Sequence, residues 1–574
     1  MSTPTFSVKS GIYTTPFSLE ISCDDNAVIY YTTDGSIPSA EDYKYTEPIL
    51  IGSPSGSIDV TTSTADIHTP QVADVIRAIA INSYGETSEI VSSTYFVGEQ
   101  NFPCDTIISL IVDSDDLFGD FGIYVTGKEY EDWLTTGGDG VAPTPNYLKR
   151  GDEWERPAFF SLFQNGELSI EHPVGIRIQG ASAREEDNKR FSVIARDNYG
   201  VGNFFADSPF RQEYPVHSIV LRSGFMNGFI QHMMQGRDVA SAENMEVMVY
   251  INGCPWYITI AQEKYNTYYF ESHYGLDRDN VVIIKAGYAD SGEKDDQEMY
   301  DRIYNFIQTH SLSSPDAYEA FCNIVDIQSF IDFSCINLFF GNMDFSEDKN
   351  VICWRSRNTG AGEYEDGLWR WALYDMDLEN LDYGYPETDI NTFNLDTHYA
   401  GPAFNTRPLY KALKQNPTFC RQFVLTFLDL LNTELTLDAA RAAMDTWNIH
   451  MELWGKSEDW LVDYFTKRPD KMREYLAEEF GLSGETAQLT IRTDVSEGGT
   501  ISVNTITPDC TDGSWTGIYY TDYPVTLSAV PADGYHFVGW TLGKEKNYYS
   551  KDANIDYSLP LEGASLCAHF EKKD

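Results

Sequence analysis

The sequence predicts a multidomain protein whose central domain is α+β and two-lobed, with an N-terminal β-sandwich before it and a small C-terminal β-rich domain after it. A chain of 574 residues is too long for one hydrophobic core. Both ends alternate apolar and polar residues between turn signals, whereas the middle has strand-like runs first and helical patterns later. We therefore expect three domains, at 1–99, 100–486 and 487–574.

The composition is that of a folded and strongly acidic protein. Hydrophobic residues make up 42% of the chain and aromatic residues 14%, as packed cores require. The 40 Lys and Arg against 88 Asp and Glu give a net charge of −48, and this field repels phosphate backbones and anionic membranes. We expect no nucleic acid partner. No run of about 18 apolar residues occurs, so we expect no membrane span.

The N-terminal region reads as a small β-sandwich. Its strand-like runs are separated by turn signals such as Asp34-Gly35. The segment 29–38, with Tyr45 and residues 48–50 after it, resembles the chitobiase/β-hexosaminidase C-terminal module of secreted bacterial proteins. This resemblance implies a spacer, with sugar binding as the lesser alternative.

The C-terminal region reads as short strands joined by turns such as Gly498-Gly499. The run 527–540, with residues 568–570 at its end, resembles the internalin B-repeat-like modules of bacterial surface proteins. Cys510 and Cys567 share this region, and the sequence leaves open whether they pair.

The two flanking modules together imply an extracytoplasmic location, either secreted or at the cell surface. Residues 1–8 contain no apolar signal core, so we presume that a signal segment has been removed. We expect the modules to be structural, with polysaccharide or surface contact as the alternative.

The central region combines both periodicities. Its first half holds apolar strand-like runs at 107–112, 175–178 and 247–251. In its second half a helix is predicted from Asp326 as N-cap to Phe340, with Gly341 as its stop. Strands before helices favour a domain of two lobes.

The most informative residues lie in the second half of this region. Asp344 and Asn350 follow the predicted helix, and Asp375 and Asp377 close an aromatic-rich strand. Such oxygen ligands hold Mg²⁺ or Mn²⁺ against the phosphates of ATP. On an extended strand Asp375 and Asp377 share a face and would ligate one ion, while Asp344 would orient the attacking hydroxyl. The pattern predicts phosphoryl transfer.

A phosphate site also needs a cation. A turn of small residues containing Ser182 and Arg184 precedes Lys189, so that backbone amides and an ammonium group would face the phosphates. Glu263 follows an apolar strand and is the candidate partner of that ammonium. Lys285 leaves another apolar strand and is a rival to Lys189.

With these residues identified, the region from 104 to about 440 resembles the spore-coat CotH protein kinase family. The similarity is carried by Ile107-Ile108-Ser109-Leu110, Gly175-Ile176-Arg177-Ile178-Gln179-Gly180-Ala181-Ser182-Ala183-Arg184, Val249-Tyr250-Ile251-Asn252-Gly253, Gln262-Glu263-Lys264-Tyr265 and Arg370-Trp371-Ala372-Leu373-Tyr374-Asp375-Met376-Asp377. The resemblance implies a CotH kinase-like domain at 100–486. It also implies an atypical protein kinase that uses ATP and a divalent metal to phosphorylate hydroxyls of a protein substrate that the sequence does not identify.

The family pattern assigns roles by position. Lys189 matches the nucleotide lysine, Asp344 the catalytic-loop aspartate, and the pair Asp375 and Asp377 the metal-binding D-x-D. The chain departs from the pattern at Ala183, where the family tends to have Ser, and at residues 373–374, where it tends to have Pro-Trp.

Two alternatives remain at this point. One is a catalytically silent kinase fold that serves as a surface binding or scaffold protein. The other is a glycoside hydrolase, because Asp375, Asp377 and Glu379 also form a D-x-D-x-E string such as chitinases use.

Overall fold

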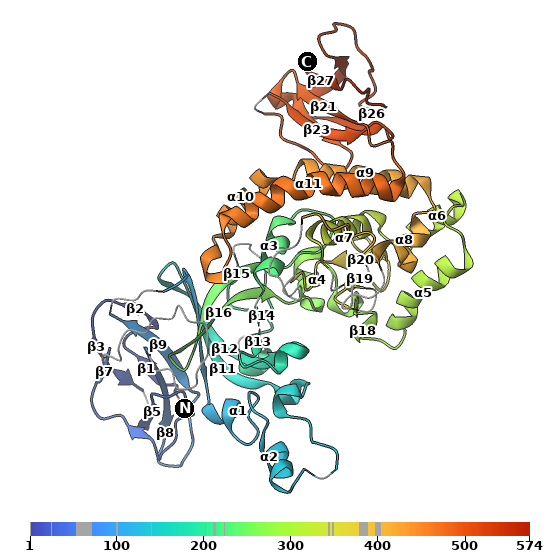
Figure 1. Ribbon diagram of the computed structural model, residues 1–574. Coiled ribbons are helices and arrows are strands. Elements are labelled where there is room, and N and C mark those ends of the chain that lie inside the picture. Colours follow the sequence, from blue (N-terminus) through green and yellow to red (C-terminus); the bar gives the residue numbers. More distant parts are fainter. Residues whose placement is uncertain are drawn as a thin grey trace. The chain divides into compact units, whose positions relative to one another are not determined.

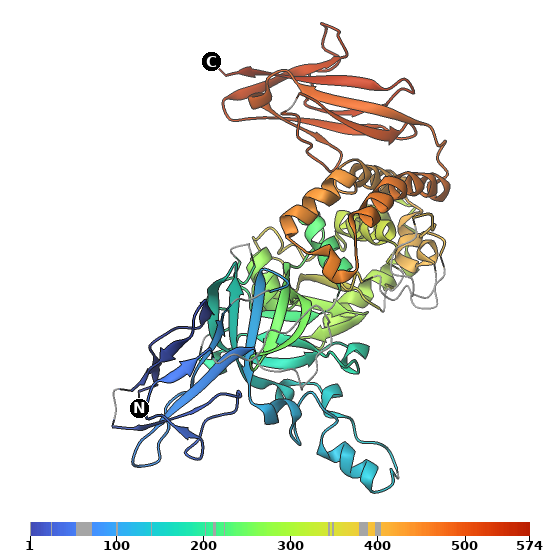
Figure 2. The ribbon, with the colours of Figure 1, turned by 60° about the vertical axis from the view of Figure 1, so that its left-hand side comes forward.

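The protein folds into two compact units. Figures 1 and 2 show their strands and helices, coloured along the sequence. The computed structural model describes residues 2–23, 26–52, 72–98, 102–138, 140–200, 202–210, 214–222, 224–342, 345–346, 349–377, 388–395, 403–511 and 513–573. The first unit comprises 1–228, 242–278 and 448–455, and the second comprises 229–241, 279–447 and 456–574.

The first unit begins with a β-rich module, as predicted. Its main sheet has the order β2-β9-β8-β5-β6, and the pairs β1-β4 and β3-β7 complete it. The strands are β1 (Thr5–Phe6), β2 (Gly11–Tyr13), β3 (Phe17–Leu19), β4 (Ile21–Ser22), β5 (Val28–Thr32), β6 (Tyr43–Lys44), β7 (Ile49–Ile51), β8 (Ala73–Ile81) and β9 (Val91–Val97). The predicted turn after β5 is present: Gly35 has φ +87°, and an Asp34 carboxylate oxygen accepts from Ser36.

A closed barrel follows in the same unit, with the order β10-β11-β12-β13-β14-β16-β15. Its strands are β10 (Thr106–Val112), β11 (Arg156–Gln164), β12 (Glu167–Gln179), β13 (Arg190–Ile194), β14 (Ser218–Arg222), β15 (Asn244–Ile251) and β16 (Cys254–Glu263). Three of them contain the predicted runs 107–112, 175–178 and 247–251. Buried apolar side chains from all seven strands form the core.

The N-terminal module and the barrel share a second apolar cluster. The Phe96 ring of β9 packs edge-on against Tyr250 and Phe163 of the barrel. Thr94 and Ser109 hydroxyls hydrogen-bond at 2.9 Å within this interface. The helices of this unit are short: α1 (Ser114–Phe118), α2 (Lys128–Thr135) and α4 (Thr267–Tyr274), with α3 (Phe225–Met233) running into the second unit.

The second unit is built on a small sheet with the order β18-β17-β19-β20. Its strands are β17 (Val281–Lys285), β18 (Tyr288–Ser291), β19 (Ile352–Ser356) and β20 (Arg370–Ala372). Its helices are α5 (Asp296–Thr309), α6 (Pro315–Cys322), α7 (Ile327–Phe340), α8 (Pro408–Leu413), α9 (Pro417–Asn432), α10 (Leu437–Trp447) and α11 (Glu458–Phe480).

Helix α7 confirms its predicted ends. The Asp326 carboxylate accepts from the Ser329 amide, and Gly341 ends the helix with φ +65°. All but one of its side chains are buried, and Phe330 packs against Trp371 of β20 with ring centroids 5.0 Å apart. In the part of the chain that the structure describes, no helix combines the length and the apolar character needed to cross a membrane.

The C-terminal module completes the second unit and is β-rich, as predicted (Figure 2). Two sheets, β23-β21-β27-β25 and β22-β24-β26, contain β21 (Thr486–Thr493), β22 (Gly499–Val503), β23 (Trp515–Tyr520), β24 (Val525–Pro531), β25 (Tyr535–Leu542), β26 (Asn554–Tyr557) and β27 (Ala564–Lys572). Buried Asp429 of α9 accepts hydrogen bonds from Asn504, Thr505 and Tyr519, which fixes the module to the helices. Cys510 and Cys567 are both free thiols.

Candidate functional site

One end of the small sheet in the second unit gathers several of the predicted residues. Lys285 is the last residue of β17 and pairs with Ile352, the first residue of β19. Ile352 in turn pairs with Ala372, the last residue of β20. Asn350 lies two residues before β19, and Asp375 lies three residues after β20. Both residues therefore lie at the end of the sheet where β17 ends with Lys285. Chain segments 286, 349–351 and 373–377 leave the sheet at this same end.

The backbone at this sheet end is unusual. Ala286, Asn350 and Asp375 have left-handed φ angles of 50°, 52° and 54°. Left-handed backbone is rare outside glycine and is strained for Ala. Such strain is found where surrounding contacts over-determine the chain, and it clusters at functional sites.

Lys285 lies among groups that favour its charge. Its ammonium lies 4.5 Å from the centroid of the Tyr374 ring. Burial lowers the pKa of Lys285, but Tyr374, Asp290 and Asp375 outweigh burial and raise its pKa above the ordinary value. The charged form of Lys285 is thus favoured, and Asp375 is one of the carboxylates that favour it.

The segment after β20 differs from the extended strand that we predicted. The last ladder residue is Ala372, and the left-handed φ of Asp375 breaks the extended run. The alternation of exposure survives: Met376 is fully buried, while Asp375 and Asp377 are half-buried. The prediction of an extended strand is therefore wrong, because buried anchors override the local β pattern.

Two of those anchors are hydrogen bonds. The Gln231 amide of α3 donates to the Leu373 carbonyl at 2.8 Å. The Asn342 amide, at the end of α7, donates to the Met376 sulfur at 3.5 Å. Asn342 begins the loop that carries Asp344, so this loop leaves α7 beside the Asp375–Asp377 segment.

Asp344 itself lies outside the described residues, as does Glu379. The residue after it, Phe345, is buried; its carbonyl accepts from Arg407, whose guanidinium stacks 4.1 Å above the Phe345 ring. The role of Asp344 stays a prediction. Among the residues that the structure describes, no cluster of three or more His, Cys, Asp or Glu side chains is arranged around a metal-sized space.

Lys189 occupies a different setting in the first unit. Its ammonium donates to the Glu186 carbonyl at 2.7 Å and lies 4.5 Å from the centroid of the Tyr147 ring and 5.2 Å from that of Tyr124. Burial lowers the pKa of Lys189, although nearby acidic residues partly oppose this. These contacts account for the ammonium without a phosphate, and its nucleotide role stays a prediction.

The predicted pair between Lys189 and Glu263 is not formed. Glu263 accepts from His273 at 2.8 Å and is buried, which raises its pKa. The strand ladder explains why: Val193 pairs with Ile219, and Ile219 pairs with Glu263. Lys189 lies four residues before Val193, a separation of about 13 Å along the strand.

The predicted phosphate-binding turn is a short helical turn at Ser182–Arg184. Ser182 is exposed, but the Arg184 guanidinium is buried and donates to four backbone carbonyls, at Ile178, Gly180, Tyr147 and Lys149. Burial lowers the pKa of Arg184 to about 10, and the charges of Arg150 and Arg177 contribute. Arg184 therefore holds two chain segments together in this structure.

Sequence reasoning missed some residues of the sheet end. The sequence patterns assign no role to Tyr374, Asn342, Gln231 or Ala286. Lys285 was predicted only as an alternative to Lys189 for the cation that faces the phosphates. Its signal was the apolar run at 281–284 before it, a pattern that many surface lysines share.

Comparison with known protein families agrees with the sequence patterns. The model described as CotH kinase protein matches residues 176–478, more than half of the chain. Residues 19–95 match the Fn3 associated model, and residues 490–574 match the divergent InlB B-repeat domain. No curated protein matches the chain significantly. The chain therefore belongs to the CotH kinase protein family and carries an N-terminal Fn3-associated module and a C-terminal divergent InlB B-repeat domain.

Proposed function

We propose that the chain is an atypical protein kinase that transfers the γ-phosphoryl group of ATP to hydroxyl groups of a protein substrate. The observation that carries this proposal is the convergence of Lys285, Asn350 and Asp375 at one end of the β17-β19-β20 sheet. Family membership supports it, because the matching model describes a kinase protein. The proposed location is outside the cytoplasm, on the strength of the InlB-type module.

The oxygen ligands at the sheet end fit a hard divalent cation. Asp375 and Asp377 offer carboxylates and Asn350 offers a carbonyl, which are the donors that Mg²⁺ and Mn²⁺ prefer. When bound, such an ion offsets the negative charge that builds up on the transferring phosphoryl group. Asp375 is half-buried, so the residue is partly accessible to solvent.

In our proposal, Lys285 takes the place of Lys189 as the cation that faces the phosphates. An ammonium fixed by Tyr374 needs no reorganisation to face a phosphate, and preorganised charge is an efficient form of transition-state stabilisation. Asp344, at the attacking hydroxyl, remains part of the proposal on the family pattern alone.

The decisive experiment measures ATP binding with Mg²⁺ or Mn²⁺ and then transfer of radiolabelled phosphate to protein. Asp375→Ala removes the carboxylate that lies beside Lys285, so we expect loss of transfer by a factor of about a thousand or more. Asp316→Ala is the matched control, since Asp316 is an exposed aspartate on α6. It should transfer as the parent does.

The outcomes separate the remaining alternatives. Label on the parent and on Asp316→Ala, but not on Asp375→Ala, supports the kinase. ATP binding without label supports a silent scaffold. No ATP binding at all contradicts both interpretations of the site.

The glycoside hydrolase alternative gains no support from the fold. Chitinase-type D-x-D-x-E strings stand on a strand of an eight-stranded parallel barrel. Here Asp375 and Asp377 follow β20 of a four-stranded sheet, and the described barrel is a separate, seven-stranded and largely antiparallel structure.

A further inference from the structure

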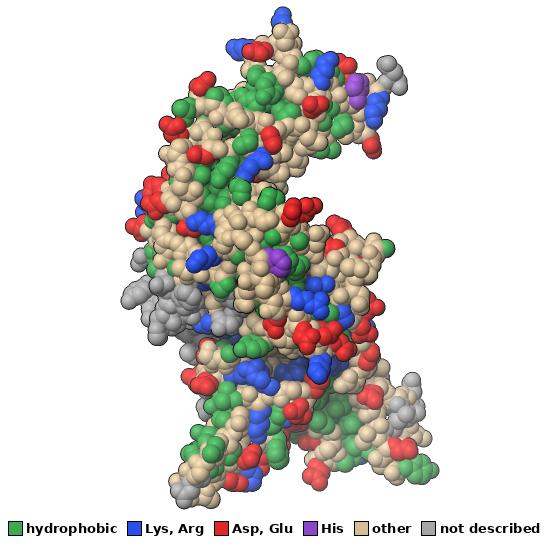
Figure 3. Space-filling model, turned by 90° about the vertical axis from the view of Figure 1, so that its right-hand side faces the viewer, with side chains coloured by type: hydrophobic (Ala, Val, Ile, Leu, Met, Phe, Trp, Pro, Cys, Tyr) green, Lys and Arg blue, Asp and Glu red, His purple; other side chains and the backbone are tan. Residues whose placement is uncertain are grey.

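A basic pocket lies on the barrel of the first unit. Its volume is about 160 Å³, and its lining includes four cationic side chains and no carboxylate. These are Lys149, Arg150, Arg177 and Arg184. On the face drawn in Figure 3, Lys and Arg side chains gather around a hollow in its lower half. For a chain of net charge −48, such a lining is unexpected on a solvated surface.

Arg184 gives the pocket its frame. Its bonds to the carbonyls of Tyr147 and Lys149 on one side, and of Ile178 and Gly180 on the other, tie the loop 146–150 to the end of β12. This loop carries Lys149 and Arg150. The pocket is thus held open by a buried guanidinium whose partners are neutral carbonyls, so its charge is not cancelled.

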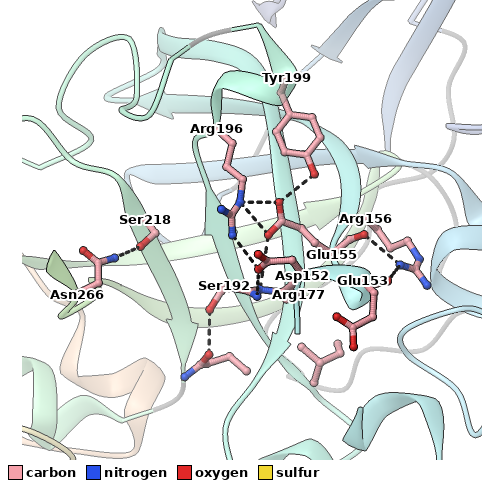
Figure 4. Close-up of polar contacts among 12 residues, drawn as sticks. Asp152, Glu153, Glu155, Arg156, Arg177, Ser192, Arg196, Tyr199, Ser218 and Asn266 are labelled. Carbon is pink, nitrogen blue, oxygen red and sulfur yellow. Dashed lines mark hydrogen bonds and ion pairs between the residues drawn. The ribbon is translucent and has the colours of Figure 1, made fainter. Parts of the chain in front are cut away.

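Two acidic residues near the pocket, Asp152 and Glu155, already have partners (Figure 4). Arg177 and Arg196 both point at Asp152, at 2.8 Å and 3.2 Å. They also contact Glu155, which accepts from the Tyr199 hydroxyl as well. Two cations balance two carboxylates here, and this network fixes the direction of the Arg177 side chain.

The remaining charges make the lining positive. Arg150 donates to the Gly180 carbonyl at 3.2 Å. The four hydrogen bonds of Arg184 described above all go to backbone carbonyls. Lys149 forms an ion pair with the Glu129 carboxylate at 3.4 Å, and Glu129 is largely exposed. Three like charges around one space repel each other until an anion enters it.

The size and chemistry of the pocket indicate its ligand. A volume of about 160 Å³ is well below the ~300 Å³ or more of pockets that hold whole small molecules. A guanidinium group can donate two parallel hydrogen bonds to two oxygens of one phosphate. Trp154 gives the pocket one apolar wall. We propose that this pocket binds a phosphate monoester, carried by a phosphorylated side chain of a protein.

This site goes beyond the proposed kinase activity, and only the origin of the phosphorylated protein rests on that activity. A kinase that holds a phosphorylated side chain in one unit would retain substrates that are already partly phosphorylated. The same chemistry is present in the phosphate tail of ATP, so the test has to distinguish these two sources.

The experiment is calorimetric titration of the full chain, at physiological ionic strength and without divalent metal. The probes are inorganic phosphate, a phosphoserine peptide, the same peptide without phosphate, and ATP. The double variant Lys149→Ala/Arg150→Ala removes two charges from the lining, and we expect it to weaken phosphate and phosphopeptide binding at least tenfold. Lys128→Ala, which removes an exposed lysine paired with Asp132, is the control and should bind as the parent does.

The outcomes either support or overturn the site. Binding of the phosphopeptide but not its unphosphorylated form, lost in the double variant and kept in Asp375→Ala, supports it even if transfer is never detected. Equal binding by parent and double variant overturns it, as does absence of phosphate binding to the parent. Tighter binding of ATP than of the phosphopeptide overturns the assignment to a side chain. Arg150→Glu, which changes one exposed residue, repeats the test if the double variant unfolds.

Discussion

Lys189 directly precedes the buried strand β13 and Lys285 ends the buried strand β17, and the sequence favours Lys189 with Lys285 as its rival. The structure separates them. Lys189 is held by a backbone carbonyl and two tyrosine rings, and burial lowers its pKa. Lys285 has Tyr374 and two carboxylates around it, and its pKa is raised.

The difference shows what a lysine needs to serve a phosphate site. A strand end supplies position only, whereas a raised pKa, a fixed direction and nearby oxygen donors depend on neighbouring chain segments. At Lys285 these come from the segments after β20 and before β19, which meet β17 through the ladder. At Lys189 the neighbouring loops supply two tyrosine rings and one backbone carbonyl instead.

The strongest test of this comparison is Lys285→Met, which keeps a chain of similar length and removes the charge. We expect phosphoryl transfer to fall about 100-fold to 1,000-fold, as when one preorganised donor is removed from an active site. The measurement is the rate of radiolabel transfer at saturating ATP. Lys411→Met, at an exposed position of α8, is the control and should be neutral. Transfer within threefold of the parent would refute the role of Lys285.

A weaker effect is expected from Tyr374→Phe. The change keeps the ring under the Lys285 ammonium and removes only the hydroxyl, whose interaction with the ammonium helps to raise the pKa of Lys285. A polar interaction of hydrogen-bond strength contributes about 0.5–1.5 kcal/mol, so transfer should slow about threefold to tenfold. Tyr288→Phe is the matched control, because Tyr288 is 72% exposed on β18. Loss as large as that of Lys285→Met would mean that Tyr374 itself contacts the substrate.

Much of the fold was predictable because its signals are local. Helix α7 was predicted from an Asp N-cap, an apolar face and a Gly stop, and each barrel strand that we predicted has an apolar run. The flanking modules were recognised by turn residues and repeat motifs. Closure of the barrel was not predicted, since it depends on pairing between strands far apart in the sequence.

The candidate site was predicted only in part for the same reason. Residue type identified Asn350, Asp375 and Lys285 as candidates, but strand register decided which of them meet. Register also placed Glu263 away from Lys189, which no local pattern reveals. The left-handed turn at Asp375 follows from the buried neighbours Leu373 and Met376, which are fixed by distant side chains.

The smallest effect on transfer is expected from Lys189→Met, and it is the result that would break the comparison. Met fills similar space between Tyr124 and Tyr147 but loses the cation–π contacts and the bond to the Glu186 carbonyl. We expect the free energy of unfolding to fall by about 1–3 kcal/mol, while transfer stays within threefold of the parent. Urea unfolding and the radiolabel assay measure the two quantities on one preparation. A hundredfold loss of transfer without loss of stability would return the nucleotide role to Lys189, because a lysine that acts only on the fold changes activity through the folded fraction alone.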